Sequence, residues 1–473
     1  FNDKVIIDGA VSIDTDDNGD TTSTDGRIIF TTSIQSETNG TDSLTLTSGA
    51  GTITLVEVGG SSKPLTSFVA TSNALTISND ITTTGLIDIN APVTLGGDVI
   101  ISSGTGTGNV EFSSTITGTQ NLDILSGSGA VTITGNIGAQ ALTSLDINAT
   151  GASTGSGNIS ILGNIGADGT SGAGIVNIGN SNTGSITLGT SGTESEYFTT
   201  GAQTYDASLY YLNGTDPDFN ASSENIKFLD GLNGFNLAAG ADLTVDTGSG
   251  EDGDINISGD IIGVAGQTTT VTLEAGSGSV ELDGIIVNGS AGIGNVTIDG
   301  SGGITIDGNI TTNGGNIDIN DATTFAGSTA LTTGGGSVDF ASTINPASGS
   351  RDLDISSGSG TVSVGGTIGG TTGFGSLDIN NASGTGAITL NDIGDTDTVG
   401  AFGTSRIGND TTLTLELAGT TYKTETVTYT SKAGENIDLT GGANTTFTTT
   451  GEDITFGTGT LEMADGSNLI IDT

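Results

Sequence analysis

The chain has 473 residues, of which 81 are Gly, and its 54 acidic side chains against 8 basic ones give a net charge of −46. Because it contains no Cys and no His, it has no disulfide, no imidazole base, no thiolate nucleophile and no ordinary zinc site. Eight basic side chains cannot neutralise a phosphate backbone, which excludes nucleic-acid binding as the main task. The composition therefore argues against an enzyme.

The remaining composition predicts ordered β-structure. Gly, Thr, Ser, Asn and Asp are turn formers or strand formers, and they are mixed with Ile, Val and Leu. Disordered acidic chains are usually rich in charge, whereas only 13% of these residues are charged. No signal sequence is visible, and no apolar run approaches the roughly 18 residues of a membrane-spanning segment.

The first candidate site along the chain is the acidic segment 14–25, with the sequence DTDDNGDTTSTD. Oxygen ligands occupy loop positions 1, 3, 5 and 12, and Gly occupies position 6, as in an EF-hand calcium loop. Position 12 is Asp rather than the longer Glu, and no helices flank the loop. The segment is either a calcium site or a solvated acidic turn. The predicted ligands are Asp14, Asp16, Asn18, Asp20 and Asp25.

Short apolar–polar–apolar segments recur from end to end of the chain. This alternation is the pattern of a strand with one buried face, and no stretch of about 10 residues shows a convincing helical period. We therefore expect an all-β protein with Ile inward and Asp outward in segments such as Leu-Asp-Ile. The segments in the first half are 44–46, 53–55, 75–77, 87–89, 122–124, 131–133, 145–147, 159–161 and 186–188.

The spacing of these strands predicts a β-solenoid. Residues 122–124 and 145–147 are 23 positions apart, and residues 353–355 and 377–379 are 24 apart. A unit of this length with two or three short strands cannot bury its apolar face alone, but stacked units form a continuous core. At this spacing the 473 residues form about 20 coils.

A second, longer period overlies the first. Residues 28–30 match 255–257 at an offset of 227, and residues 243–247 recur as 469–473 at an offset of 226. We expect two copies of a unit of about 230 residues that is entered and left in mid-copy. The predicted division is a first solenoid copy at 1–204, a second at 205–421 and the beginning of a third at 422–473.

Aromatic residues concentrate between positions 197 and 235, although they make up only 4% of the chain. One interpretation is a junction at which large rings fill a coil of different cross-section. The other is a patch on which sugars or a partner stack. The aromatics are Tyr197, Phe198, Tyr205, Tyr210, Tyr211, Phe219, Phe228 and Phe235, with Tyr422 and Tyr429 at the corresponding place of the next copy.

The repeats resemble those of a known family. Residues 127–138, GSGAVTITGNIG, and 358–369, GSGTVSVGGTIG, look like the repeats of filamentous-haemagglutinin-like adhesins and similar β-strand-repeat bacterial surface proteins. The segment 199–205, TTGAQTY, resembles a phrase that recurs in them. The resemblance implies a right-handed parallel β-helix, export to the cell surface or medium, and a role in adhesion or surface structure.

These observations together predict a structural, extracellular or cell-surface fibrous protein that is not an enzyme. It is either a stalk or filament segment of a giant repetitive adhesin, or a self-assembling filament, sheath or surface-layer subunit. The expected partners are neighbouring repeats or other copies of the chain, and cell-surface glycans or proteins. Calcium is the one expected cofactor.

Overall fold

The computed structural model describes residues 1–16, 26–138, 140–149, 155–166, 173–248, 253–264, 268–288, 292–349 and 351–473, with only the backbone at 287 and 288. Throughout these residues the regular structure is β-strand, without a helix, and so they offer no helix able to cross a membrane. The chain divides into two compact units, unit 1 at 1–238 and unit 2 at 239–473. The expected copy boundaries at 204 and 421 stay predictions, because a division by packing does not test them.

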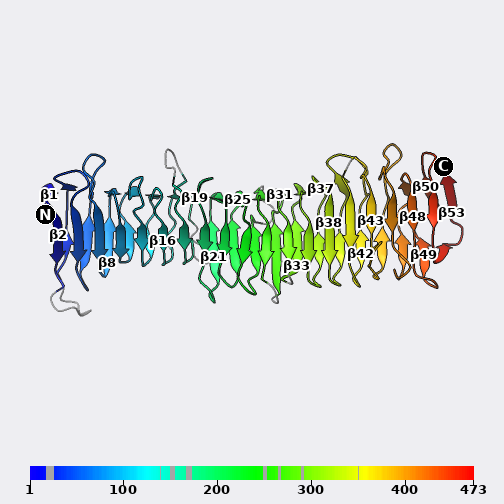
Figure 1. Cartoon of the computed structure of the whole chain (residues 1–473), viewed down its shortest axis with the longest axis horizontal. Coiled ribbons are helices and arrows are strands. Elements are labelled where there is room, and N and C mark those ends of the chain that lie inside the picture. The colour runs from blue at the N-terminus through cyan, green and yellow to red at the C-terminus, as the bar shows by residue number, and fades with distance from the viewer. Residues whose placement is uncertain are drawn as a thin grey trace. The chain divides into compact units, whose positions relative to one another are not determined.

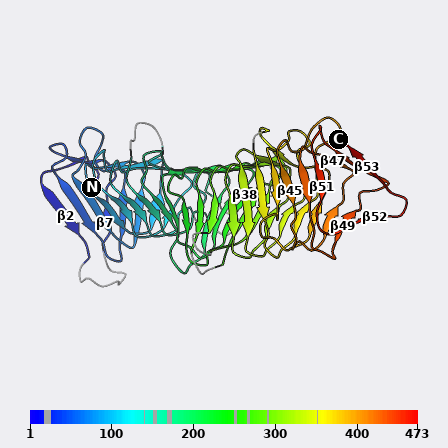
Figure 2. The same cartoon turned by 45° about the vertical axis from the view of Figure 1, so that its right-hand side comes forward.

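Each unit is a parallel β-solenoid in which every turn adds strands to sheets that run along the unit (Figures 1 and 2). In the described part of unit 1 the strands form three sheets, and single bridges such as Ile34 to Val58 continue a sheet where a strand is too short. Sheet A contains β1 (Val5–Ile7), β4 (Ile34–Ser36), β9 (Ile81–Thr82), β12 (Val99–Ser102), β15 (Asn121–Leu125), β17 (Ser144–Ile147), β19 (Ile175–Gly179), β22 (Gln203–Ala207) and β25 (Ile226–Asp230). Sheet B contains β2 (Ala10–Asp14), β5 (Ser43–Thr47), β7 (Ser67–Thr71), β10 (Ile87–Asn90), β13 (Val110–Phe112), β16 (Val131–Ile133), β18 (Ile159–Ile161), β20 (Ile186–Leu188), β23 (Tyr210–Leu212) and β26 (Phe235–Leu237). Sheet C contains β3 (Ile28–Ile29), β6 (Thr52–Leu55), β8 (Ala74–Ile77), β11 (Val93–Leu95), β14 (Ile116–Thr117), β21 (Ser195–Thr199) and β24 (Pro217–Ala221).

Unit 2 follows the same plan in its described residues. Sheet D contains β27 (Leu243–Asp246), β30 (Thr269–Glu274), β33 (Ile293–Asp299), β36 (Ile317–Ile319), β39 (Val338–Phe340), β42 (Val362–Val364), β44 (Ile388–Leu390), β46 (Leu415–Leu417), β49 (Asn436–Leu439) and β52 (Thr460–Met463). Sheet E contains β28 (Ile255–Ile257), β31 (Ser279–Leu282), β34 (Gly303–Ile306), β37 (Thr323–Phe325), β40 (Ile344–Pro346), β47 (Thr421–Lys423), β50 (Asn444–Thr448) and β53 (Asn468–Asp472). Sheet F contains β29 (Ile261–Gly263), β32 (Ile286–Asn288), β35 (Ile310–Thr312), β38 (Thr329–Thr333), β41 (Leu353–Ser356), β43 (Leu377–Ile379), β45 (Ser405–Ile407), β48 (Val427–Tyr429) and β51 (Ile454–Phe456).

The expected solenoid is confirmed, with about 18 turns against the 20 predicted. Turn length varies because loops absorb insertions: Val110 pairs with Val131, 21 residues on, and Val131 pairs with Ile159, 28 residues on. The right hand of the coil remains an implication of the family resemblance.

The alternation of strand residues decides which side chains form the core. Ile124, Ile147, Ile355 and Ile379 are fully buried, and the Asp residue that precedes each of them lies on the outer face. The inward and outward assignment made from the sequence is therefore correct. Stacked turns bury these apolar side chains, each of which contributes roughly 1.5–3 kcal/mol.

The longer sequence period does not equal a whole number of turns. Residues 243–247 and 469–473 share the pattern of Leu, two residues and then Asp-Thr. Strand β27 carries the first segment and pairs with β30 in sheet D, whereas β53 carries the second and pairs with β50 in sheet E. Equivalent strands of unit 2 therefore lie on different faces of the coil.

Close packing at one corner of unit 1 explains part of the high glycine content. A Cβ atom at Gly108 would lie 2.5 Å from the backbone of Gly85, one at Gly129 would lie 2.0 Å from the Gly108 carbonyl oxygen, and one at Gly157 would lie 1.8 Å from the Gly129 carbonyl oxygen. Four successive turns thus stack glycine on glycine at distances that exclude any side chain.

Candidate functional site

The predicted calcium loop is only partly visible. Asp14 is the last residue of β2, and its carboxylate accepts a hydrogen bond of 2.9 Å from the Asp16 N–H. Asn18, Asp20 and Asp25 lie outside the described residues. Elsewhere in the described chain, no three or more Asp, Glu, His or Cys side chains are grouped so that they could hold a metal ion. The calcium site therefore stays a prediction.

The aromatic residues of unit 1 belong to the core. Tyr197, Tyr205 and Tyr210 are buried, and their rings stack on Phe219, Phe228 and Phe235 of the following turn at centroid distances of 4.7, 5.0 and 4.4 Å. Because these rings are not accessible, the interpretation of the whole cluster as a sugar-stacking patch is wrong. Tyr211, 40% exposed, and the half-buried Phe198 are the members that face outward.

Hydrogen bonds inside the core hold the phenol groups of Tyr205 and Tyr210. Tyr205 donates 2.9 Å to the side-chain oxygen of the fully buried Gln203, whose amide donates to the Tyr197 and Asn220 carbonyl oxygens. Tyr210 donates to the carbonyl oxygen of Leu229 at 2.6 Å. Burial raises the pKa of all three phenols, Tyr197, Tyr205 and Tyr210, above the ordinary value.

The same stacking recurs in unit 2. Tyr422 stacks on Phe447 at 4.9 Å, and Tyr429 stacks on Phe456 at 5.7 Å, again between register partners of successive turns. The sequence placed Tyr422 and Tyr429 at the corresponding position of the next copy, and their packing has the same form. The rings of Tyr422, Tyr429 and Phe447 are structural, because they are buried inside the coil.

A buried polar corner was not anticipated from the sequence. In unit 1 the amide of Asn148 hydrogen-bonds to Ser126 of the previous turn, and the amide of Asn180 donates 2.7 Å to the Asn148 carbonyl oxygen. In unit 2 Ser357, Asn380 and Asn409 make the equivalent contacts. The signal in the sequence was a Ser-Gly-Ser-Gly segment followed 22 or 23 residues later by Asn.

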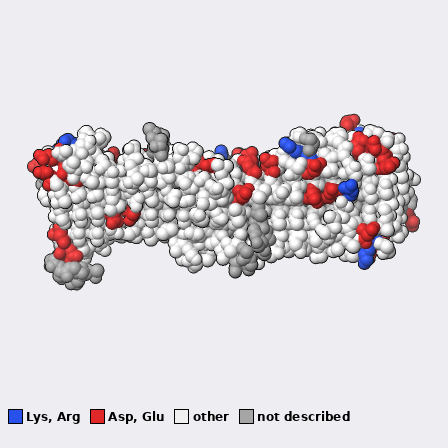
Figure 3. Space-filling model, in the orientation of Figure 1, with Lys and Arg blue, Asp and Glu red and all other residues white. Residues whose placement is uncertain are grey.

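Carboxylates form columns on the outer faces of unit 2. Glu274 pairs in register with Asp246 on one side and Asp299 on the other, and the three line a hollow of about 430 Å³ with Gly248 and Gly276. Figure 3 shows that acidic side chains gather in patches with few basic ones among them. Carboxylates stacked in this way repel one another electrostatically.

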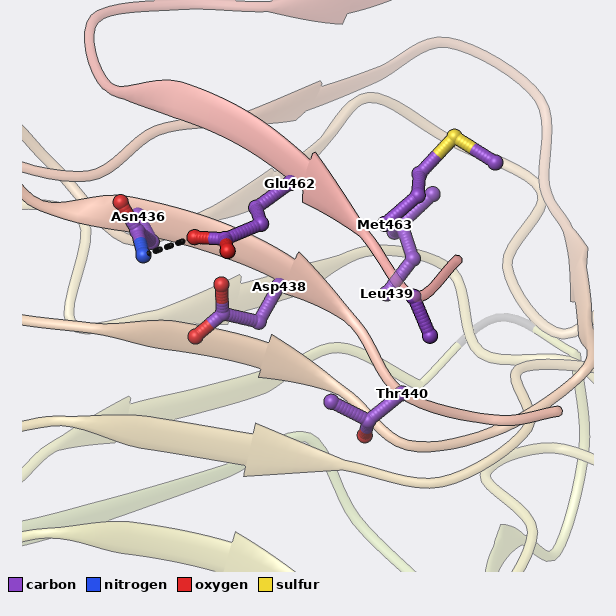
Figure 4. A pocket seen from close by; sticks show the side chains of 7 residues that line it. Asn436, Asp438, Leu439, Thr440, Glu462 and Met463 are labelled. Atoms are coloured by element: carbon purple, nitrogen blue, oxygen red, sulfur yellow. Dashed lines mark hydrogen bonds between the residues drawn. The ribbon is translucent and has the colours of Figure 1, made fainter. Parts of the chain in front are cut away.

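A second hollow, of about 470 Å³, lies over β49 and β52 (Figure 4). Asn436 donates a hydrogen bond of 2.5 Å to the Glu462 carboxylate, and Asp438 lies beside them. Glu416, Asp438 and Glu462 are again register partners on successive turns. In both hollows the carboxylates are register partners on successive turns. This repeated arrangement differs from the single irregular cleft of a polysaccharide-cleaving enzyme.

Comparison with known proteins returned no match, whether to a family model, a curated protein or a solved structure.

Proposed function

We propose that this chain is a structural segment of an extracellular or cell-surface fibrous protein, a stalk that holds an adhesive part away from its cell. The proposed role is structural and includes no catalytic activity. The resemblance of residues 127–138 and 358–369 to adhesin repeats supports the surface location. Calcium bound at the segment 14–25 is part of the same proposal.

One observation carries the proposal, namely that the same internal contacts recur about 230 residues apart. The contact between Asn148 and Ser126 in unit 1 reappears between Asn380 and Ser357 in unit 2, an offset of 232 for Asn and 231 for Ser. A repeating stack lengthens by adding turns, because each turn contacts only its neighbours. A repeating stack of this kind suits a spacer, whereas a catalytic or binding site needs an arrangement of residues that occurs once.

Mechanical unfolding tests the stalk. The full chain is tethered by its two ends and pulled, and we expect discrete steps that each release one or a few turns. Extension without measurable resistance would contradict the role of a stalk under tension. Attachment is measured separately, with beads carrying the full chain and control beads carrying heat-unfolded chain. Equal binding of both bead types to cells is the result expected of a stalk, whereas stronger binding of the folded chain would contradict a role as stalk alone.

A further inference from the structure

Carboxylates stack in register along the outer faces of unit 2. Glu274 stands between Asp246 and Asp299 in sheet D, Asp318 pairs with Asp339 further along the same sheet, and Asp354 pairs with Asp378 in sheet F. Neighbouring strands of a sheet are about 4.8 Å apart. Like charges held at this separation repel each other within the Debye length of about 8 Å at physiological salt.

The other groups that face these carboxylates do not neutralise them. Glu274 is flanked by Asp246 on β27 and Asp299 on β33. Asp318 lies between Thr297 on β33 and Asp339 on β39.

In sheet F, Asp354 lies between Ala330 on β38 and Asp378 on β43. The Arg406 guanidinium is on the far side of this pair, on β45, with its Nη1 atom 3.6 Å from the Asp378 carboxylate. The cation therefore contacts Asp378, and Asp354 faces a carboxylate.

The electrostatic consequence is the same at all three positions. Partial burial, followed by the neighbouring carboxylates, raises the pKa of Glu274, Asp318 and Asp354. In the unfolded chain these neighbours are apart, because residues such as Asp318 and Asp339 are joined only by the strand pairing. These three carboxyls therefore bind protons more tightly in the folded unit than in the unfolded chain.

We propose that the in-register carboxylates make unit 2 an acid-stabilised solenoid, in which proton uptake by one member of each group, as the pH falls toward the ordinary carboxyl range of about 4, removes the repulsion between successive turns. A fibre built from such units is most stable against unfolding at acidic pH and becomes less stable as the pH rises toward neutrality. This inference depends on the fold alone and holds for a stalk or a filament.

The sign of the effect follows from proton linkage. A carboxyl whose pKa is raised in the folded state contributes stability that is fully present below its unfolded pKa, which is 3.8 for Asp, and that is lost as the pH rises through the folded pKa. Asp395 acts oppositely, because the N–H groups of Thr398 and Asp397 lower its pKa. Its contribution is fully present above the ordinary pKa of 3.8 and is lost as the pH falls through the lowered pKa of the folded state.

Thermal unfolding of the full chain at pH 4.5 and 7.5, at one ionic strength, tests the proposal. The double variant Glu274→Gln, Asp318→Asn removes two stacked charges, and Asp453→Asn, Asp465→Asn removes two exposed charges that lie outside the strands. We expect the wild type to melt higher at pH 4.5. The stacked variant should gain about 2–4 °C at pH 7.5, gain little at pH 4.5, and exceed the control. Equal gains in the two variants would overturn the proposal, because total charge alone would then explain the effect.

Proton release on unfolding is a second measurement that needs only the wild type. At pH 5 the folded chain should hold more protons than the unfolded chain, so unfolding in weakly buffered solution should release protons. Proton uptake on unfolding, or a wild type that melts lower at pH 4.5 than at pH 7.5, contradicts the proposal.

Discussion

The side-chain amide of Asn380 donates a hydrogen bond of 2.9 Å to the hydroxyl of Ser357 on the previous turn, and its carbonyl oxygen accepts the Ser357 N–H at 2.8 Å. Both residues are buried, and the backbone of Asn380 has a φ of 49°. The position demands a left-handed backbone together with a donor and an acceptor. Asn meets all three demands, because it tolerates this conformation better than most residues.

Replacing Asn380 therefore destabilises unit 2. Asn380→Ala leaves the Ser357 N–H without its acceptor and strains the backbone, and we expect a loss of about 2–4 kcal/mol in the free energy of unfolding. Asn380→Gly loses the same hydrogen bonds but relieves the strain, so it should be more stable than the Ala variant by about 1 kcal/mol. Urea unfolding measures both, with Asn381→Ala as the neighbouring control. An Ala variant as stable as the Gly variant would show that the left-handed backbone costs nothing here.

The glycine column of unit 1 gives a second prediction. Gly129→Ala puts a Cβ atom where the Gly108 carbonyl oxygen lies 2.0 Å away, whereas Gly106→Ala finds its nearest atom at 3.9 Å. Overpacking of this kind typically costs about 1–3 kcal/mol. We expect Gly129→Ala to lower the thermal midpoint and Gly106→Ala to leave it nearly unchanged. If the two changes have equal effects, loss of backbone freedom and not close approach governs this corner.

The aromatic core of unit 2 contains two tyrosines that should respond oppositely to loss of the hydroxyl. The Tyr422 oxygen accepts the Gly419 N–H at 2.8 Å, whereas the buried Tyr429 hydroxyl has no hydrogen-bond partner among the described residues. Tyr422→Phe should therefore destabilise the fold by about 1–2 kcal/mol. Tyr429→Phe should be neutral or stabilising, because it removes a desolvated polar group. Denaturant midpoints of the two variants give the comparison, and a larger loss for Tyr429→Phe would refute the assignment.

The strand alternation was sufficient to predict the core from sequence. Leu-Asp-Ile at 122–124 has a single arrangement that buries two apolar side chains and keeps the carboxylate in water, so Ile124 inward and Asp123 outward followed directly. The spacing of about 24 residues then left stacked turns as the way to bury one face per strand.

The buried polar corner and the aromatic packing could not be predicted by the same reasoning. Nothing local distinguishes Asn148 from the other Asn residues of the turns, because its role depends on Ser126, 22 residues away and one turn below. The rings of Tyr197 and Phe219 were visible as a cluster, but whether they faced inward depended on the strand phase of each segment. Contacts between turns, unlike alternation within a strand, require the turn lengths to be known.

Calcium binding at the segment 14–25 is the last prediction. Asp14 and Asp16 are already close, since the Asp16 N–H donates to the Asp14 carboxylate, and hard cations prefer such oxygen ligands. A cation that binds the folded chain more tightly than the unfolded chain raises stability by mass action. We expect millimolar calcium to raise the melting temperature relative to chelator at matched ionic strength, and the double variant Asp14→Ala, Asp16→Ala to lose this shift. The control Asp453→Ala, Asp465→Ala removes the same charge elsewhere and should keep it. If calcium shifts the melting temperature of neither the wild type nor the variant, the segment is a solvated turn. Equal shifts in all three proteins mean that calcium only screens the net charge of −46.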